Sequence, residues 1–176
     1  MKGGQIVNYN IYNAWHTERF RPLYNHDADC GANCFYMLGY CNFESANYLA
    51  TRTGEEGLML TTILYILNYT YAEGNHEWTE IPIGNLHLIR QYLIYPNRAT
   101  MGFISYDDGT GHFFVIFTGN NAHGVFNLAL DAQSGETYPL HEYLTYHHPV
   151  EFHLLNSDTS IDGHDMVTPY IINRFM

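Results

Sequence analysis

Cys30 lies at the junction between a polar run and an apolar one. Most residues from Asn25 to Asp29 are polar and favour a turn, whereas most residues from Cys30 to Leu38 are apolar and predict a helix. A thiol at a helix N-terminus lies near backbone N–H groups and the positive end of the helix dipole, which favour the reactive thiolate. The same N–H groups can stabilise an oxyanion. Cys30 is therefore a candidate nucleophile.

A thiol nucleophile needs a base, and the base needs a third group that orients it. His112 begins an apolar run directly after Gly111, and Asp131 ends the next such run. Turn residues separate the two runs as in a β-hairpin, and in an antiparallel pair the start of one strand lies beside the end of its neighbour. We therefore expect His112 and Asp131 side by side, with His112 as general base and acid.

Cys34 is the alternative nucleophile, because it lies on the same predicted helix as Cys30. A helix that starts at Cys34 would be shorter than average, whereas Cys30 gives a longer one. Core packing is a further explanation for cysteines on one helical stripe, and it is the one we expect for Cys41. His26, Cys30 and Cys34 are also spaced so that they could share a metal ion. Zinc sites usually need a fourth ligand, so we expect no metal and no other cofactor.

Composition limits the class of protein and its partners. A chain of 176 residues that is 46% hydrophobic fits one domain over residues 1–176. A formal net charge of -11, from seven basic and eighteen acidic residues, argues against nucleic acid and anionic membranes as partners. Three closely spaced cysteines are a poor disulfide framework, and no signal sequence or membrane-spanning run is evident. These features favour a cytoplasmic location.

Periodicity divides the chain into a helical part and a later strand-rich part. Residues 1–24 show no clear period and are expected to form an irregular arm, and no element is predicted for the C-terminal extension, 156–176. Helices followed by an antiparallel meander predict an α+β domain with its helices on one side of the sheet. The predicted helices are 30–41, 44–51, 57–69, 86–94 and a short one within 138–146, and the predicted strands are 78–83, 100–106, 112–118, 124–131 and 150–155.

The order of Cys30, then His112 on a strand, then Asp131 after the following strand resembles the papain-like cysteine hydrolases. Asp-Cys-Gly at 29–31 and Gly-His-Phe-Phe-Val-Ile at 111–116 are most similar to the leader-peptide-cleaving peptidase domains of bacteriocin exporters. Leu-Asp-Ala-Gln-Ser-Gly-Glu, which begins at Leu130, is similar to papain-fold toxin and effector domains. The resemblance implies a papain-like fold, with N-terminal helices packed on an antiparallel sheet, and a catalytic triad of these three residues.

The chain departs from that family at the expected oxyanion donor. Papain-like enzymes usually carry a glutamine about six residues before the nucleophile, where it helps to form the oxyanion hole. Here the corresponding residue is Tyr24. Asn25 or Gln133 could replace the missing donor, or the backbone N–H of Cys30 could act with another group.

The resemblance implies a cysteine-dependent hydrolase that cleaves a protein or peptide amide or isopeptide bond through an acyl-enzyme. Lys2 is the only lysine. Drift of composition explains this simply, but selection against lysine modification would also explain it, and then ubiquitin or a ubiquitin-like conjugate becomes the expected substrate. Two alternatives stay open. One is a glutamine deamidase or transglutaminase-type effector, delivered into a host cell, and the other is a catalytically silent papain-fold module that binds proteins.

Overall fold

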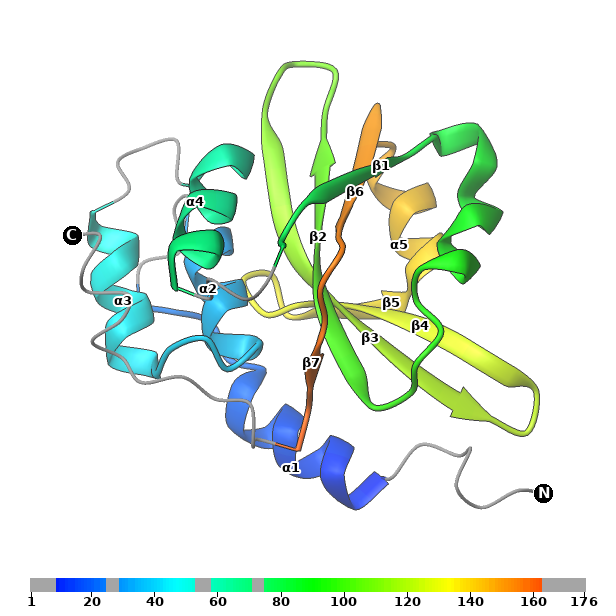
Figure 1. Ribbon diagram of the computed structural model, residues 1–176, viewed down its shortest axis with the longest axis horizontal. Coiled ribbons are helices and arrows are strands. Elements are labelled where there is room, and N and C mark those ends of the chain that lie inside the picture. The colour runs from blue at the N-terminus through cyan, green and yellow to red at the C-terminus, as the bar shows by residue number, and fades with distance from the viewer. Residues whose placement is uncertain (1–8, 25–28, 53–57, 71–74, 163–176) are drawn as a thin grey trace.

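The chain folds into an antiparallel sheet covered by helices. The computed structural model describes residues 9–24, 29–52, 58–70 and 75–162 (Figure 1). Within that part of the chain the sheet has seven strands in the order β1-β6-β2-β3-β4-β5, with β7 beside β2. The strands are β1 (Trp78–Ile81), β2 (Arg98–Ser105), β3 (Gly111–Asn121), β4 (Gly124–Asp131), β5 (Glu136–Pro139), β6 (Glu151–Leu155) and β7 (Thr159–Ser160). The expected α+β class is confirmed.

A tight hairpin on each side of β3 helps to place His112 and Asp131 at one end of the sheet. Gly109, between β2 and β3, has a φ of 87°, and Gly124, at the start of β4, has a φ of 111°. Both values lie in the region that glycine adopts without strain, and this explains why these turns carry glycine. The hairpin between β3 and β4 brings the start of β3, at Gly111, to the same end of the sheet as Asp131.

Helices lie on both faces of the sheet (Figure 1). Alternate β3 residues face opposite sides: Phe113 and Val115 pack with the N-terminal helices, and Phe114 packs under α5. The prediction that all helices lie on one side was therefore wrong, because a strand apolar on both faces needs cover on both. One face carries α1 (Tyr9–Arg19), α2 (Cys30–Met37), α3 (Phe43–Thr51) and α4 (Leu60–Thr70), and the other carries the 3-10 helix η2 (Ile83–Gln91) and α5 (Leu140–His147).

The prediction that residues 1–24 form an irregular arm was wrong, because they contain α1. Two buried side chains of α1 reach the end of α2. The indole N–H of Trp15 donates to the carbonyl of Met37 at 2.9 Å, and the guanidinium of Arg19 donates to the carbonyl of Tyr36 at 2.9 Å. These long-range contacts add donors to carbonyls of the last helical turn, which have no i+4 partner within the helix. They stabilise α1 without the regular apolar stripe that sequence analysis looks for.

Helix α2 ends at Met37, four residues earlier than predicted, because Gly39 stops it. Gly39 has a φ of 79°. Its N–H donates to the carbonyl of Tyr36 at 3.1 Å, and the N–H of Tyr40 donates to the carbonyl of Phe35 at 2.9 Å. This pair of hydrogen bonds is the Schellman motif, in which a left-handed glycine reverses the chain at a helix end. The motif turns the chain toward α3, whose first turn is capped by the Asn42 side chain.

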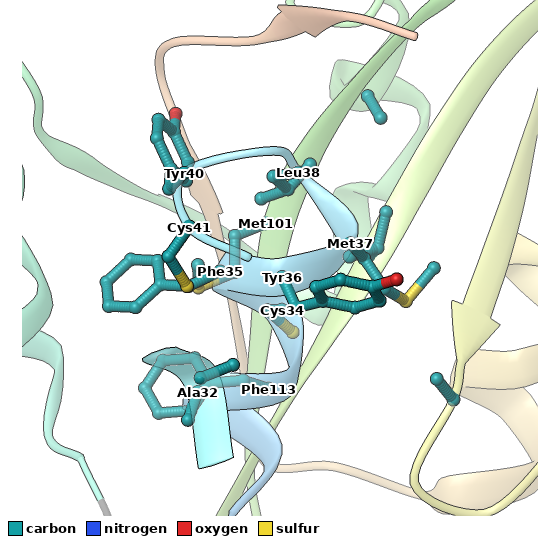
Figure 2. Close-up of a cluster of buried hydrophobic side chains, with 14 of the residues drawn as sticks. Ala32, Cys34, Phe35, Tyr36, Met37, Leu38, Tyr40, Cys41, Met101 and Phe113 are labelled. Carbon is teal, nitrogen blue, oxygen red and sulfur yellow. The ribbon is translucent and has the colours of Figure 1, made fainter. Parts of the chain in front are cut away.

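Most of α2 lies inside the core, between the other N-terminal helices and the sheet. Every residue from Gly31 to Met37 is buried. Figure 2 shows Cys34, Phe35 and Met37 in one cluster with Met101 and Phe113 from the sheet. Such complete burial fixes the helix firmly, so its first residue has a defined position relative to the strands.

The C-terminal extension contributes β7, where no element was predicted. The Arg98 side chain donates to the carboxylate of Asp158 at 2.7 Å, just before this strand. The rest of the extension, 163–176, lies outside the described residues. No helix in the described part of the chain is long and apolar enough to cross a membrane.

Replacing Gly39 with alanine should destabilise the protein by about 1 kcal/mol, because alanine is strained in the left-handed conformation. Urea unfolding of the two proteins measures the difference. Gly84→Ala is the matched control, since Gly84 has no positive φ and nothing lies within 4 Å of an added Cβ. A loss no larger for Gly39→Ala than for Gly84→Ala would contradict the assignment of Gly39 as the helix stop.

Candidate active site

His112 and Asp131 form a hydrogen-bonded pair at the end of the sheet. Nε2 of His112 lies 2.5 Å from Oδ2 of Asp131. The histidine side chain is 16% exposed and the carboxylate side chain 3% exposed, so the pair is largely shielded from water. The expectation that these two residues lie side by side is confirmed.

The Asp131 carboxylate receives hydrogen bonds from three donors. Besides His112, the hydroxyl of Tyr143 donates to Oδ2 at 2.9 Å, and the backbone N–H of Ser134 donates to Oδ1 at 3.2 Å. Burying a carboxylate is costly unless donors and an opposite charge surround it. These donors hold the carboxylate in one orientation, with Oδ2 facing the imidazole.

Cys30 is brought to the same place by the N-terminus of α2. Its sulfur accepts a hydrogen bond of 3.4 Å from the backbone N–H of Phe113, the residue after His112 on β3. Cys30 also lies close enough to the imidazole to raise the pKa of His112. Because Nε2 of His112 is bonded to Asp131, Nδ1 is the ring nitrogen left for the sulfur. The next residue, Gly31, packs closely enough that a Cβ there would lie 3.2 Å from Leu58.

His112 and Asp131 each stabilise the charged form of the other, and Cys30 adds to the effect on His112. Burial alone would lower the pKa of His112, but the hydrogen bond to Asp131 and the nearness of Cys30 and Asp131 raise this pKa to about 10. Burial likewise opposes ionisation of Asp131, but the bonds from His112 and Tyr143 hold the pKa of this carboxyl below its ordinary value. An imidazolium between a carboxylate and a sulfur is therefore the favoured state at neutral pH.

The other two cysteines lie in less reactive surroundings. Cys34 is 3% exposed, and burial together with the nearby Cys30 and two carboxyl groups raises its pKa well above the ordinary value. Burial also raises the pKa of Cys41 to about 12, and the residue is completely enclosed in the core. A thiol that stays protonated is a poor nucleophile. Of the two candidate nucleophiles, the geometry favours Cys30 over Cys34.

Gln133 and Asp29 connect the two halves of the site. The Gln133 amide nitrogen donates to Oδ1 of Asp29 at 2.5 Å, and Asp29 immediately precedes Cys30 and is 1% exposed. Gln133 also lines one pocket together with Cys30, Cys34 and Asp131. The bond therefore links the loop after β4 to the start of α2. Asn25, the other proposed oxyanion donor, lies outside the described residues.

Tyr143 and Asp29 belong to the site, and the sequence did not predict this for either residue. Tyr143 is one of sixteen tyrosines, and nothing in its local sequence distinguishes it from the others. Asp29 precedes the nucleophile directly, and that position was the one available signal for its role. Asp29 contacts Gln133, which is 104 residues away along the chain, and Tyr143 contacts Asp131, which is 12 residues away. Neither contact follows from a local sequence pattern.

One group of three possible metal ligands lies elsewhere in the described part of the chain. Glu80 on β1 and Glu151 and His153 on β6 have ligand atoms within 4.8 Å of one another. Glu80 and His153 are register partners, so the group forms across the pair of strands. It contains neither Cys30 nor Cys34. His26, the third member of the metal site considered from the sequence, lies outside the described residues.

The pH dependence of stability should report the His112–Asp131 pair. The pKa of His112 is about 10 in the folded protein and 6.5 is its ordinary value, so protonated His112 stabilises the fold fully below pH 6.5. That contribution is lost as the pH rises through 10. We therefore expect the stability gap between wild type and His112→Gln, measured by urea unfolding, to shrink steadily from pH 6 to pH 10. The exposed turn residue His123 supplies the control, His123→Gln; a gap for His112→Gln that stays constant would contradict the pairing.

Comparison with known proteins does not assign the chain to a family. The chain matches no protein-family model and no curated protein. What supports a function is therefore the placement of Cys30, His112 and Asp131 from three separate elements in one site.

Proposed function

We propose that this protein is a papain-like thiol hydrolase that cleaves amide bonds in a protein or peptide. The observation that carries the proposal is the position of His112, whose imidazole is hydrogen-bonded to Asp131 and whose neighbour Phe113 donates its backbone N–H to the sulfur of Cys30. A nucleophile, a base and an orienting carboxylate in this relation are what acyl transfer requires. A nucleophile at a helix N-terminus facing an antiparallel sheet also fits the papain-like architecture that the motifs resemble.

In the first half of the reaction the Cys30 thiolate attacks the carbonyl carbon of the substrate. A C–S bond forms and the carbonyl π electrons move to oxygen, giving a tetrahedral oxyanion. When the oxyanion collapses, the C–N bond breaks, and the leaving amine takes the proton of imidazolium His112. An acyl-enzyme and a neutral imidazole result. Asp131 stays ionised throughout and keeps the ring oriented.

In the second half, water releases the acyl group. The neutral imidazole of His112 removes a proton from the water as its oxygen attacks the thioester carbon. Collapse of the second tetrahedral intermediate breaks the C–S bond, which releases a carboxylic acid product and the Cys30 thiolate. The site returns to its starting imidazolium–thiolate state, and no cofactor takes part.

The oxyanion is stabilised by backbone N–H groups of the first turn of α2, which have no partner within the helix. Gln133 is a further candidate, because it lines the pocket beside Cys30. Its amide nitrogen is held by Asp29 at 2.5 Å, so any movement of Gln133 toward substrate involves that bond.

The substrate class is a protein or peptide, and the narrower candidate is a ubiquitin or ubiquitin-like conjugate. The near absence of lysine, with Lys2 as the one example, supports the narrower candidate. Cleavage of an isopeptide bond uses the same steps as cleavage of a peptide bond, because both leaving groups are amines.

Alkylation by a neutral reagent tests the nucleophile. At pH 6, wild-type protein should react with chloroacetamide about tenfold faster than free cysteine, because a helix N-terminus and a neighbouring imidazole favour the reactive form of a cysteine. Cys30→Ala should abolish this fast reaction. The matched control Cys34→Ala should leave it intact, since Cys34 is buried and its pKa is raised. Fast labelling that survives in Cys30→Ala would move the nucleophile elsewhere.

Mass spectrometry of reacted proteins and peptides distinguishes the reactions open to this triad. We expect hydrolysis products from a peptide library, and an adduct with a propargyl-ubiquitin probe if the conjugate class is right. Both should be absent in His112→Ala. A mass gain of about one unit without cleavage would instead identify a glutamine deamidase. Cys30 that reacts no faster than free cysteine would leave a silent protein-binding module.

A further inference from the structure

Tyr143 contacts the triad from the face of the sheet opposite α2. Its hydroxyl donates to Oδ2 of Asp131 at 2.9 Å, and the same oxygen accepts the bond from His112. The tyrosine is completely buried, and it belongs to α5. The carboxylate therefore lies between two donors, one that takes part in the proposed chemistry and one that is remote from substrate.

The packing of Tyr143 leaves its hydroxyl little freedom. The ring centroid lies 4.5 Å from that of Phe114, two residues after His112 on β3, and 4.2 Å from that of His147 on α5. His147 is itself fixed, because Nδ1 lies 3.0 Å from the Tyr106 hydroxyl. Close packing on both sides means that the hydroxyl is aimed by the protein core and needs no reorganisation.

The charged and titratable groups around this bond come from several elements. Glu136 on β5 lies 3.4 Å from Nε2 of His147, and Tyr106 follows β2 directly. Burial and the neighbouring Asp131 carboxylate raise the pKa of Tyr143, so its hydroxyl stays a neutral donor across the working pH range. His112 faces the other side of the carboxylate from β3, with Cys30 beyond it on α2.

We infer that Tyr143 is a positioning residue for the proposed hydrolase: it holds the Asp131 carboxylate toward His112 and helps to keep that carboxylate ionised. This role rests on the proposed function. Loss of the hydroxyl removes one of the donors that favour the ionised carboxylate, so Asp131 takes up its proton at a higher pH. Once it is neutral, it no longer supports the imidazolium beside Cys30.

The pH dependence of Cys30 alkylation tests the role of the hydroxyl. Wild-type protein and Tyr143→Phe are reacted with chloroacetamide from pH 3 to pH 9. We expect the acid limb of the rate profile to move up by about one pH unit in Tyr143→Phe, which is roughly a tenfold slower reaction on that limb. The chemical shift of the low-field proton on Nε2 of His112, followed by NMR, should change at the same higher pH.

Two control variants separate positioning from packing. Tyr146→Phe removes a hydroxyl from the same helix at a side chain that is 70% exposed, and Leu144→Val removes buried volume there without touching the Asp131 bond. Both should keep the wild-type profile, even where Leu144→Val lowers the melting temperature. A Tyr143→Phe profile that superimposes on wild type, or an equal shift in Leu144→Val, would overturn the inference.

The outcomes also separate this inference from the proposed function. Slow wild-type alkylation would refute the hydrolase, whereas fast alkylation with an unshifted variant would refute only the role of Tyr143.

A measurement on wild-type protein does not depend on how the variant folds. The hydroxyl proton of Tyr143 should exchange slowly with water and show a nuclear Overhauser contact to Nε2–H of His112, and rapid exchange without that contact would count against the inference.

Discussion

A carboxylate that is almost fully buried must be surrounded by donors, and Asp131 is where the separate parts of this fold meet for that reason. The imidazole comes from the start of β3, the backbone N–H from the turn after β4, and the hydroxyl from α5. If any one of these elements were displaced, a buried charge would lose a partner. The His112–Asp131 pair and the packing of the sheet end are therefore one interaction network.

The thiol is attached to this network from the other face of the sheet. Helix α2 is buried along its length, and its first residue reaches the N–H of Phe113. The bond from Gln133 to Asp29 gives a second link between α2 and the loop that follows Asp131. Two independent links fix the distance from sulfur to imidazole more firmly than a helix N-terminus alone could do. This rigidity is what a preorganised site requires.

The sequence was most informative where structure is local. Glycine and polar residues mark the hairpins on either side of β3, so the proximity of His112 and Asp131 followed from strand pairing alone. The N-terminus of α2 was likewise evident from the change of polarity at Cys30. Each of these predictions depends on neighbours within a few residues or on one short turn, which is the range over which sequence patterns carry information.

The parts that could not be predicted depend on contacts between distant segments. Helix α1 has no regular apolar stripe that would predict it. Trp15 and Arg19 stabilise it instead through hydrogen bonds to carbonyls at the end of α2. Tyr143 acquires its role only when α5 packs over Phe114, and no local pattern marks it. The preference for Cys30 over Cys34 likewise depends on how deeply each side chain is buried, and the spacing of the two cysteines does not reveal this.

The strand order has a consequence for biosynthesis. β6 is made after β5, yet it lies between β1 and β2 and pairs with both. A nascent chain that already contains Cys30, His112 and Asp131 must therefore wait for Glu151–Leu155 before its sheet can close. Pairing between such remote segments is slow to form, because a long loop must first be ordered. The sheet consequently stays incomplete while the ribosome is still translating the residues before Glu151.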